Sequence, residues 1–376
     1  MLLNIKSSRH SSVFPLSIVF FLLAIMVMFV QGCEEDKKPV DPDPGEQVLI
    51  VVNQGDGSIM EFNANTYERL DSVSSGVNKP HHIEFSRDGE YAYVVNRDAG
   101  GTIAKFNLST LELLAVENGG ASVLPTSIAI SADGLTGWAT DFTGAGNGHL
   151  QKYNLETMQW VDSTVATGRG THDVKITTDG NTLVACNDAS DGITVYTVNT
   201  GNVEQININD ANPFTGVRNY GPYGVAIDNA DSLVYIACRV SNDVRIMDLA
   251  TQTMLDSIAV PPSGLGGEPG GPCLLRLSPD GSKLYVTTQR DNQLIVISTA
   301  TRQIIKTITF STPESFGVYT NEDGTRVYVA CVNNANQNGR IYIINGTNDT
   351  VLDSITVGKN PYMVHFHDHE GHGHAE

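Results

Sequence analysis

The sequence predicts an all-β protein, a seven-bladed β-propeller in which four-stranded antiparallel blades form a ring. Three observations predict this fold. The chain repeats itself with a period of about 45 residues, every repeat contains segments in which apolar and polar residues alternate, and one threonine recurs in each of seven copies. A repeat of this length with four short strands is typical of one propeller blade.

The longest segment of the repeat is recognisable in six copies. They start at Pro80, Pro125, Thr171, Pro222, Pro272 and Pro313, and read "PHHIEFSRDGEYAYVVN", "PTSIAISADGLTGWATD", "THDVKITTDGNTLVACN", "PYGVAIDNADSLVYIAC", "PCLLRLSPDGSKLYVTT" and "PESFGVYTNEDGTRVYVAC". Alternation rich in Val, Ile, Tyr and Thr predicts two strands in each copy. Asp-Gly pairs between them predict tight turns, because glycine accepts a positive φ. Two further alternating segments complete each unit as its third and fourth strands.

The number of blades follows from a marker at the end of the third strand. A threonine stands there in seven units: Thr66, Thr110, Thr157, Thr200, Thr251, Thr301 and Thr347. The N-terminal part supplies only the second to fourth strands of a unit, and "PYMVHF" from Pro361 supplies a lone first strand. We expect the ring, over residues 47–366, to close by pairing these N-terminal strands with the last C-terminal strand, which removes exposed sheet edges.

The N-terminus is predicted to be a targeting segment. Lys6 and Arg9 precede an apolar run from Phe14 to Val30, the order expected of a secretory signal. An uncleaved membrane anchor is the alternative, because a run of about 17 residues is near the lower limit for spanning a bilayer. We assign residues 1–32 to a lipoprotein signal peptide and residues 33–46 to an acidic, Pro-rich linker.

Cys33 directly follows Gly32, and the "GC" pair at the end of the apolar run resembles a bacterial lipoprotein lipobox. The resemblance implies that Cys33 is diacylated and anchors the chain to a membrane, since two or more acyl chains hold a protein firmly. The following "EED" resembles the export tag of surface-exposed lipoproteins in Bacteroidota. The expected location is therefore the bacterial cell envelope, at the outer membrane or the cell surface.

The charge and the cysteines limit the partners. A formal net charge of −19 makes nucleic acid an unsuitable partner, and we expect a monomer. Cys186, Cys238 and Cys331 lie in similar apolar contexts of different repeats. We expect them to be separate, buried free thiols rather than disulfides.

The repeat resembles a known family. "SPDGSKLYVTT", with its siblings "YVVN" and "YVAC", resembles the YVTN-type β-propeller repeat of bacterial envelope and surface proteins, over essentially all of residues 47–366. The last residue of the tetrad is Asn only in some blades. Propellers of this kind are also similar to the lactonase-type seven-bladed enzymes and to the haem- or copper-bearing propellers of respiratory enzymes. Such folds host many functions, so the fold alone assigns none.

Loop length indicates a binding face. The Asp-Gly and threonine turns are short, whereas residues 141–149, 208–221, 260–271 and 332–340 are long connections that all fall on the face where the first strands begin. Insertions gathered on one face of a repeat array often mark a binding face. The sequence therefore favours a binding or interaction module that presents this face to a protein, a glycan or a small anionic ligand.

Candidate ligand-binding residues are placed at the axial mouth of that face. They are His81, His82, His172, Asp173, Arg97, Arg239, Arg290, Tyr223 and Tyr362. Imidazoles can ligate metals or act as acid and base near neutral pH, with Cys273 or Glu314 as further ligands, and arginines suit carboxylate or phosphate. The alternatives are a lactonase-like hydrolase in this axial funnel and an ordinary polar lining. Three histidines are too few for a copper propeller.

The C-terminal tail, residues 367–376, is rich in histidine. His367, His369, His372 and His374 could chelate Zn²⁺, Ni²⁺ or Cu²⁺, which is a third candidate function; a solvated tail without metal is the alternative. We expect the tail to leave on the face opposite the funnel. No Gly-x-Ser-x-Gly motif, haem-attachment motif or phosphate-binding loop occurs in the sequence, so it assigns no catalytic residue.

Overall fold

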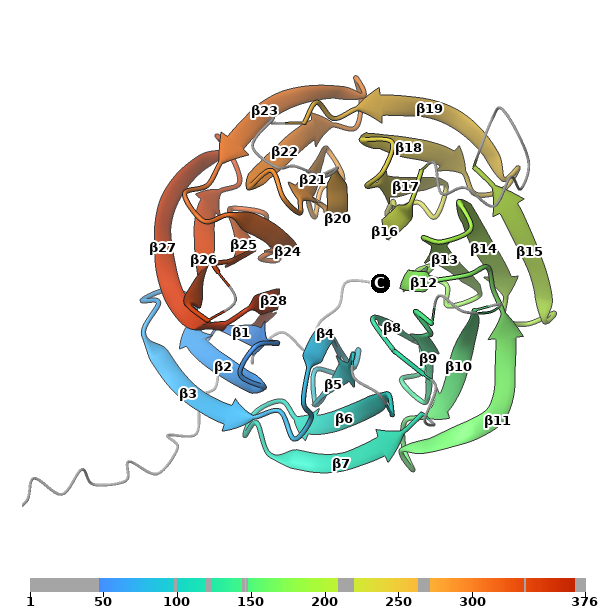
Figure 1. The fold of residues 1–376 in the computed structure, drawn as a ribbon, viewed down its shortest axis with the longest axis horizontal. Coiled ribbons are helices and arrows are strands. Elements are labelled where there is room, and N and C mark those ends of the chain that lie inside the picture. The colour runs from blue at the N-terminus through green and yellow to red at the C-terminus, as the bar shows by residue number, and fades with distance from the viewer. Residues whose placement is uncertain are drawn as a thin grey trace, which may run out of the picture. The chain divides into compact units, whose positions relative to one another are not determined.

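A computed structural model describes residues 47–97, 100–119, 123–143, 146, 148–208, 220–262, 271–334 and 336–368. Strands account for the regular structure of these residues, and no helix in them is long and apolar enough to cross a membrane. The strands form seven separate four-stranded antiparallel sheets. The predicted seven-bladed β-propeller is confirmed, and Figure 1 shows the blades around a common axis.

Blade 1 combines both ends of the described chain, in the order β28 (Pro361–Asp368), β1 (Gln47–Asn53), β2 (Ser58–Asn63) and β3 (Arg69–Ser74). β1 and β28 pair antiparallel, with Leu49 opposite Phe366 and Val51 opposite Val364. Residues Val48–Val52 are fully buried, because β1 is covered by strands on both sides and by neighbouring blades. The predicted closure of the ring is thus confirmed.

The other six blades follow the chain. Blade 2 contains β4 (Pro80–Phe85), β5 (Tyr91–Asn96), β6 (Thr102–Asn107) and β7 (Leu113–Asn118). Blade 3 contains β8 (Ile128–Ile130), β9 (Thr136–Thr140), β10 (His149–Asn154) and β11 (Gln159–Ala166). Blade 4 contains β12 (Thr171–Ile176), β13 (Thr182–Asn187), β14 (Gly192–Thr197) and β15 (Asn202–Asn207).

Blade 5 contains β16 (Pro222–Ile227), β17 (Leu233–Cys238), β18 (Asp243–Asp248) and β19 (Thr253–Ala259). Blade 6 contains β20 (Pro272–Leu277), β21 (Lys283–Thr288), β22 (Gln293–Ser298) and β23 (Gln303–Thr309). Blade 7 contains β24 (Glu314–Thr320), β25 (Arg326–Val332), β26 (Asn338–Asn345) and β27 (Thr350–Lys359).

The hydrophobic core lies between the faces of neighbouring blades. One cluster joins Tyr93 and Ile103 of blade 2 to Ile128 and Tyr153 of blade 3, and a similar cluster joins blades 5 and 6. Both faces of the inner strands are therefore covered, which explains near-continuous apolar runs such as "YAYVVN". The outermost strands alternate between exposed and half-buried residues, as β7 does.

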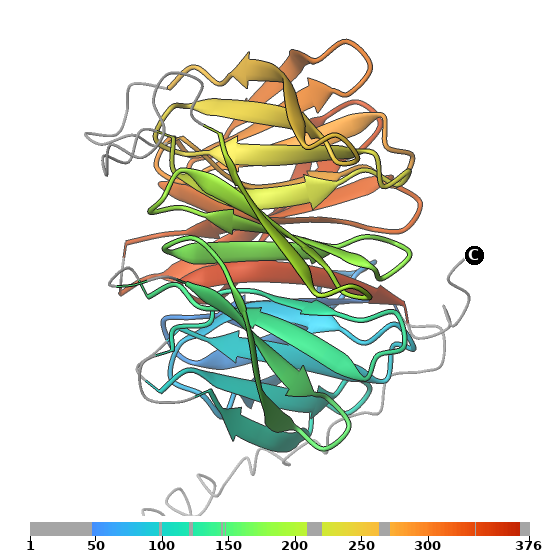
Figure 2. The same cartoon turned by 90° about the vertical axis from the view of Figure 1, so that its right-hand side faces the viewer.

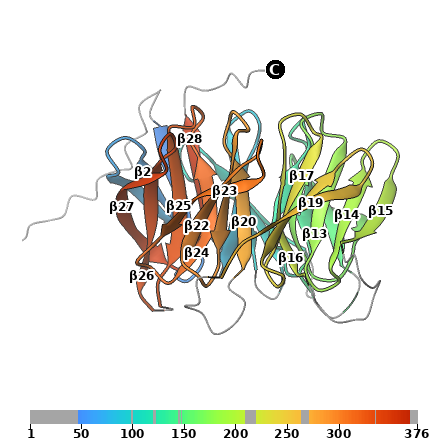
Figure 3. The same cartoon turned by 90° about the horizontal axis from the view of Figure 1, so that it is seen from above.

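The two faces of the ring differ in their turns. We call the face on which the first strands begin the start face, and the face on which they turn into the second strands the end face; Figures 2 and 3 show the blades running between them. The predicted Asp-Gly turns lie on the end face, where Gly89 has a φ of 70° and its amide donates to the Ser86 carbonyl. Blade 5 lacks this glycine, and Asp231 takes the same conformation with a φ of 52°.

The four cysteines of the described chain, Cys186, Cys238, Cys273 and Cys331, are buried and free, which was predicted for all but Cys273. Burial raises the pKa of the Cys186 and Cys238 thiols well above the ordinary value, so both remain protonated. The expected separation holds only partly, because Cys186 and Cys238 pack in the same hydrophobic cluster between blades 4 and 5.

Candidate functional site in the axial pocket

Each of the seven first strands runs beside the axis, so residues at equivalent strand positions form a ring of seven at each level along it. Strand pairing identifies equivalent positions: Glu84 lies opposite Tyr93, Lys175 opposite Val184, and Arg276 opposite Tyr285. The full set at this level, which we call the axial belt, is Glu84, Ala129, Lys175, Ala226, Arg276, Tyr319 and His365. The set three residues earlier, which we call the axial plug, is His81, Thr126, His172, Tyr223, Cys273, Phe316 and Tyr362.

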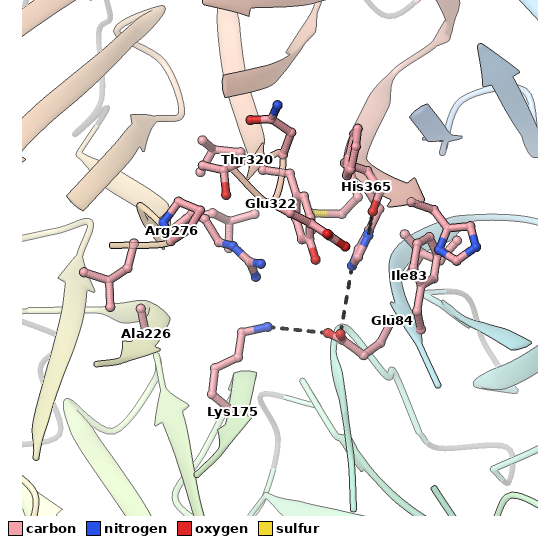
Figure 4. A pocket seen from close by; sticks show the side chains of 18 of the residues that line it. Ile83, Glu84, Lys175, Ala226, Arg276, Thr320, Glu322 and His365 are labelled. Carbon is pink, nitrogen blue, oxygen red and sulfur yellow. Dashed lines mark hydrogen bonds and ion pairs between the residues drawn. The ribbon is translucent and has the colours of Figure 1, made fainter. Parts of the chain in front are cut away.

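A pocket of about 800 Å³ occupies the axis beside the belt. Turn residues of the end face line its mouth, among them Arg87, Asn229 and Asn321. Figure 4 shows Glu84, Lys175, Arg276 and His365 converging on it from different blades. The pocket is therefore an end-face cavity that combines carboxylate, imidazole and two permanent cations.

Neighbouring members of the belt touch in sequence around the axis. The Arg276 guanidinium lies 3.9 Å from the centre of the Tyr319 ring, and that ring lies 3.7 Å from the His365 ring. His365 Nε2 is 4.0 Å from Glu84 Oε1, and Glu84 Oε2 is 3.8 Å from Lys175 Nζ. Five charged or aromatic side chains thus form one chain of contacts, in which Lys175 reaches Glu84 past the small Ala129. Ala226 stands between the two ends of this chain, Lys175 and Arg276.

His365 is held in a fixed orientation. Its ring lies between those of Phe85 and Tyr319, with centroid distances of 3.8 and 3.7 Å. Its Nδ1 donates a hydrogen bond of 3.0 Å to the Phe366 carbonyl, so Nε2 carries the lone pair. Burial lowers the pKa of His365 well below the ordinary value, and the imidazole is neutral at neutral pH.

Two opposing effects act on the pKa of the Glu84 carboxyl group. Burial raises its pKa, whereas the charges of Lys175 and Arg276 act in the opposite direction. Its Oε1 and the bare Nε2 of His365 are two acceptors 4.0 Å apart, a separation too long for a direct hydrogen bond. Nε2 has no hydrogen-bond partner among the described residues and almost no accessible surface, so the Glu84 carboxylate is the member of this pair that solvent and ligands reach.

The axial plug separates this pocket from the start face. His81 stacks on Tyr362 with a centroid distance of 3.7 Å, His172 stacks on Tyr223 at 3.4 Å, and the two tyrosine hydroxyls share a hydrogen bond of 3.0 Å. All four side chains are buried, with at most 5% of their surface exposed. These four predicted candidates are brought together, but they pack against one another and do not line the pocket.

The plug histidines are neutral. His81 Nδ1 donates to the Thr126 carbonyl at 2.9 Å, and His172 Nδ1 donates to the Tyr223 carbonyl at 3.0 Å. Burial, aided by the charge of Arg97, lowers the pKa of His81 to about 3, and burial also lowers that of His172. Both histidines are therefore unsuited to exchanging protons near neutral pH.

Two predicted candidates, His82 and Asp173, do line the pocket, at its floor. Asp173 accepts hydrogen bonds from the Ser127 hydroxyl and the Val225 amide, and it lies 4.0 Å from Lys175. Its oxygens are thus largely committed to tying blades 3, 4 and 5 together.

The predicted arginines lie towards the start face. Arg239 donates to both carboxylate oxygens of Asp188 at 3.0 Å and covers the Tyr223 ring. Arg97 lies 4.9 Å from the centre of the Phe142 ring, and Arg290 is exposed. These three arginines are therefore separated from the pocket by the axial plug.

Sequence reasoning missed the axial belt. The signal that could have found it is the fifth residue of each repeat copy and of the segment from Pro361, or the seventh in the copy from Pro313, which reads Glu, Ala, Lys, Ala, Arg, Tyr and His around the ring. The expected place of Glu314 beside the axial histidines was also wrong, because the first strand of blade 7 is in a different register. Strand pairing makes Phe316, and not Glu314, equivalent to Tyr223, because Gly317 and Gly224 occupy the same register.

The described residues contain no group of three or more His, Cys, Asp or Glu side chains arranged to hold a metal ion. Of the tail histidines, only His367 is described; it lines the pocket mouth, so β28 ends on the end face as expected. His369, His372 and His374 lie outside the described residues, as does Cys33.

Comparison with known families agrees with this architecture. The family model described as "Lactonase, 7-bladed beta-propeller" matches residues 39–258 and 172–366. The chain belongs to this family. No curated protein matches this lactonase-family propeller.

Solved structures share the fold at low sequence identity. The periplasmic gluconolactonase PpgL of Pseudomonas aeruginosa has 18% identity and a TM-score of 0.68, covering 85% of this chain and 98% of that one. A functionally unknown protein from Desulfotomaculum acetoxidans DSM 771 has 14% identity and a TM-score of 0.66, with the same coverage. Hydrazine synthase of Kuenenia stuttgartiensis has 15% identity and a TM-score of 0.62, covering 76% and 88%.

Proposed function

We propose that this lactonase-family propeller hydrolyses a small cyclic ester in the axial pocket. The observation that carries the proposal is the accessible Glu84 carboxylate, 3.8 Å from Lys175 Nζ and 4.0 Å from His365 Nε2, in a pocket that Arg276 also lines. This arrangement can orient and deprotonate a water molecule beside groups that stabilise a developing negative charge. Membership of the lactonase family and the fold shared with a gluconolactonase support the ester as substrate.

In the proposed reaction, ionised Glu84 takes a proton from a water molecule in the pocket. The water oxygen forms a bond with the lactone carbonyl carbon, and the carbonyl oxygen becomes an oxyanion. The bond between that carbon and the ring oxygen then breaks, and the ring oxygen takes the proton from Glu84. Lactone and water become one hydroxy acid, and Glu84 returns to its ionised form.

Lys175 and Arg276 are the groups that would bind the negative charge of the oxyanion or of the product. Ala226 stands between them in the belt, and its small side chain leaves room for an oxyanion or for the carboxylate of the product. The guanidinium is already held against the Tyr319 ring, so little side-chain freedom is lost when it binds.

The experiment is a pH-stat assay of the full-length chain on two six-membered lactones, D-glucono-1,5-lactone and 3,4-dihydrocoumarin. We expect acid release above the spontaneous rate, a strong loss in Arg276→Gln, and no loss in Arg290→Gln, which changes an exposed arginine of the start face. Absence of hydrolysis by the wild type would reject the proposal. Loss in the Arg290 variant alone would move the site to the start face.

A second candidate function is ligand binding on the start face. Three of the four predicted long connections join strands there, whereas the fourth is shortened to residues 333–337 because β25 ends at Val332 and β26 begins at Asn338. The exposed Arg290 stands beside half-buried Glu314, whose pKa is raised by burial and lowered by this arginine. A glycan array probed with the wild type and with Arg290→Gln tests it: a glycan bound only by the wild type supports this function, and no binding by either rejects it for glycans.

We also propose that the chain is a YVTN-type envelope lipoprotein anchored through Cys33. The support is the apolar run that ends at Gly32 and the Pro-rich spacer behind the cysteine. Metabolic labelling with a clickable palmitate analogue should label the wild type and not Cys33→Ala. Equal label on both proteins, or none on either, contradicts the anchor.

A further inference from the structure

We propose that the substrate of the axial pocket carries an apolar or aromatic ring beside its lactone carbonyl, and is not a polyhydroxylated sugar lactone. This inference rests on the proposed function. It follows from the distribution of polar and apolar side chains in the pocket, which divides the cavity into two halves.

The floor is polar on one side and apolar on the other. At the level two residues before the axial belt, blades 2 and 4 contribute His82 and Asp173 to the floor, whereas blades 6 and 1 contribute Leu274 and Met363. Blades 5 and 7 have glycine at this level, Gly224 and Gly317. The glycines are required, because a Cβ on Gly224 would lie 2.4 Å from the Cys273 carbonyl oxygen.

The wall above the apolar half carries the Tyr319 and His365 rings beside the Arg276 guanidinium. Tyr319 and Phe85 enclose His365, Phe366 follows it on β28, and all four residues line the pocket. Leu277 and Ile227 extend the apolar lining towards the mouth. An apolar ring resting on Leu274 and Met363 would contact carbon on its underside and along one edge.

Two of the four reacting groups lie on the other side of the cavity, whereas Arg276 and His365 stand above Leu274 and Met363 on β20 and β28. Glu84 and Lys175 come from blades 2 and 4, above the polar floor. A ligand with its ring over Leu274 and Met363 therefore points its carbonyl at Glu84. The hydroxyls of a sugar lactone in the same pose would lose hydrogen bonds to water and find apolar side chains, which disfavours binding.

Binding of the two product acids tests this inference separately from catalysis. 3-(2-Hydroxyphenyl)propanoate and D-gluconate share a carboxylate and differ in the body that the floor contacts. By isothermal titration calorimetry we expect the aryl acid to bind about tenfold or more tightly than gluconate, the scale expected for burying an apolar group. Equal or tighter binding of gluconate, or no binding of either acid, would overturn the inference.

Variants of the floor sharpen the test. Leu274→Asn and, independently, Met363→Thr should remove most of the preference, whereas Leu255→Asn, an exposed position on β19, should keep it. Circular dichroism checks that each variant is folded, and the second variant serves if the first is not. A preference unchanged in both folded floor variants contradicts the proposed ring position.

Hydrolysis measured in parallel separates the two proposals. Hydrolysis of D-glucono-1,5-lactone in preference to 3,4-dihydrocoumarin would overturn the substrate inference and leave the proposed function standing. Tight, floor-dependent binding of the aryl acid without hydrolysis of either lactone would overturn the proposed function and leave the pocket's preference for a ring established.

Discussion

At the scale of single residues, the candidate site depends on side chains that hold one another in place. His365 cannot rotate freely, because Phe85 and Tyr319 lie on its two faces and its Nδ1 is bonded to backbone. Glu84 is less constrained by packing, and the Lys175 ammonium, 3.8 Å away, is the neighbour that stabilises its carboxylate. Such preorganisation is what a hydrolytic site requires.

The pH dependence of hydrolysis should report Glu84. Because the ionised carboxylate is the base and burial raises its pKa, kcat/KM should rise with pH through a midpoint above the ordinary value of about 4.3. Lys175 lowers this pKa, so Lys175→Met should move the midpoint to higher pH. A pH–rate profile of both proteins checks this; a midpoint that is unchanged or lower in the variant would show that another group titrates.

Replacing His365 with phenylalanine tests the role of Nε2 separately from the packing of the ring. His365→Phe keeps an aromatic ring between Phe85 and Tyr319 but removes Nε2, so we expect kcat to fall about 10- to 100-fold with little change in thermal stability. His149→Phe, at a half-exposed histidine of β10 paired with Asp141, is the matched control and should keep kcat. Equal rates in wild type and His365→Phe would remove this histidine from the mechanism.

At the scale of elements, the first strand of each blade does two things. Its apolar residues pack against the neighbouring blades. One residue supplies a side chain to the axial plug, and the residue three positions later supplies one to the axial belt. β28 matters most, because it both closes the ring on β1 and carries His365. The last strand of the described chain is therefore structural and functional at once.

Truncation tests this double role. Removing residues 361–376 uncovers the buried edge of β1 and should abolish the cooperative unfolding transition, because Val48–Val52 would lose their partner strand. Removing only residues 369–376 leaves β28 in place and should preserve both the transition and the activity. Differential scanning calorimetry compares the three proteins; a cooperative transition in the shorter chain would mean that the ring does not need this pairing.

The sequence predicted the elements far better than the site. Each strand is repeated seven times, so the period and the turns were supported by several copies, and even the exception at Asp231 keeps the turn. Ring closure followed from the incomplete units at the two ends of the repeat. The site occurs once, and loop length indicated the start face while the pocket opens on the end face. Belt residues such as Lys175 and Arg276 look like ordinary charged strand residues, since only the closed ring brings them together.

At the scale of the whole molecule, the plug makes the two mouths of the ring independent. Stacked His81, His172, Tyr223 and Tyr362 fill the axis, so a ligand on one face has no direct contact with a ligand on the other. Changes at the start-face arginines should for this reason leave chemistry in the pocket unaffected.

The plug should also contribute strongly to stability. Tyr362→Ala would leave a cavity beside His81 and Phe316 and deprive the Tyr223 hydroxyl of its partner. We expect the free energy of unfolding to fall by about 3–5 kcal/mol, as for other buried aromatic residues. Trp160→Ala, at a half-exposed position on β11, should cost much less. Urea denaturation measures both; equal losses would show that the axis is not a packed core.

The account as a whole depends on one assignment, that Glu84 is the base of a hydrolytic site. The most direct test is kcat/KM for lactone hydrolysis by the wild type, Glu84→Gln and Glu314→Gln, the last changing a half-buried glutamate on the start face. We expect Glu84→Gln to lose about 10²- to 10⁴-fold, the usual contribution of a general base, and Glu314→Gln to match the wild type. Full activity in Glu84→Gln would contradict the account.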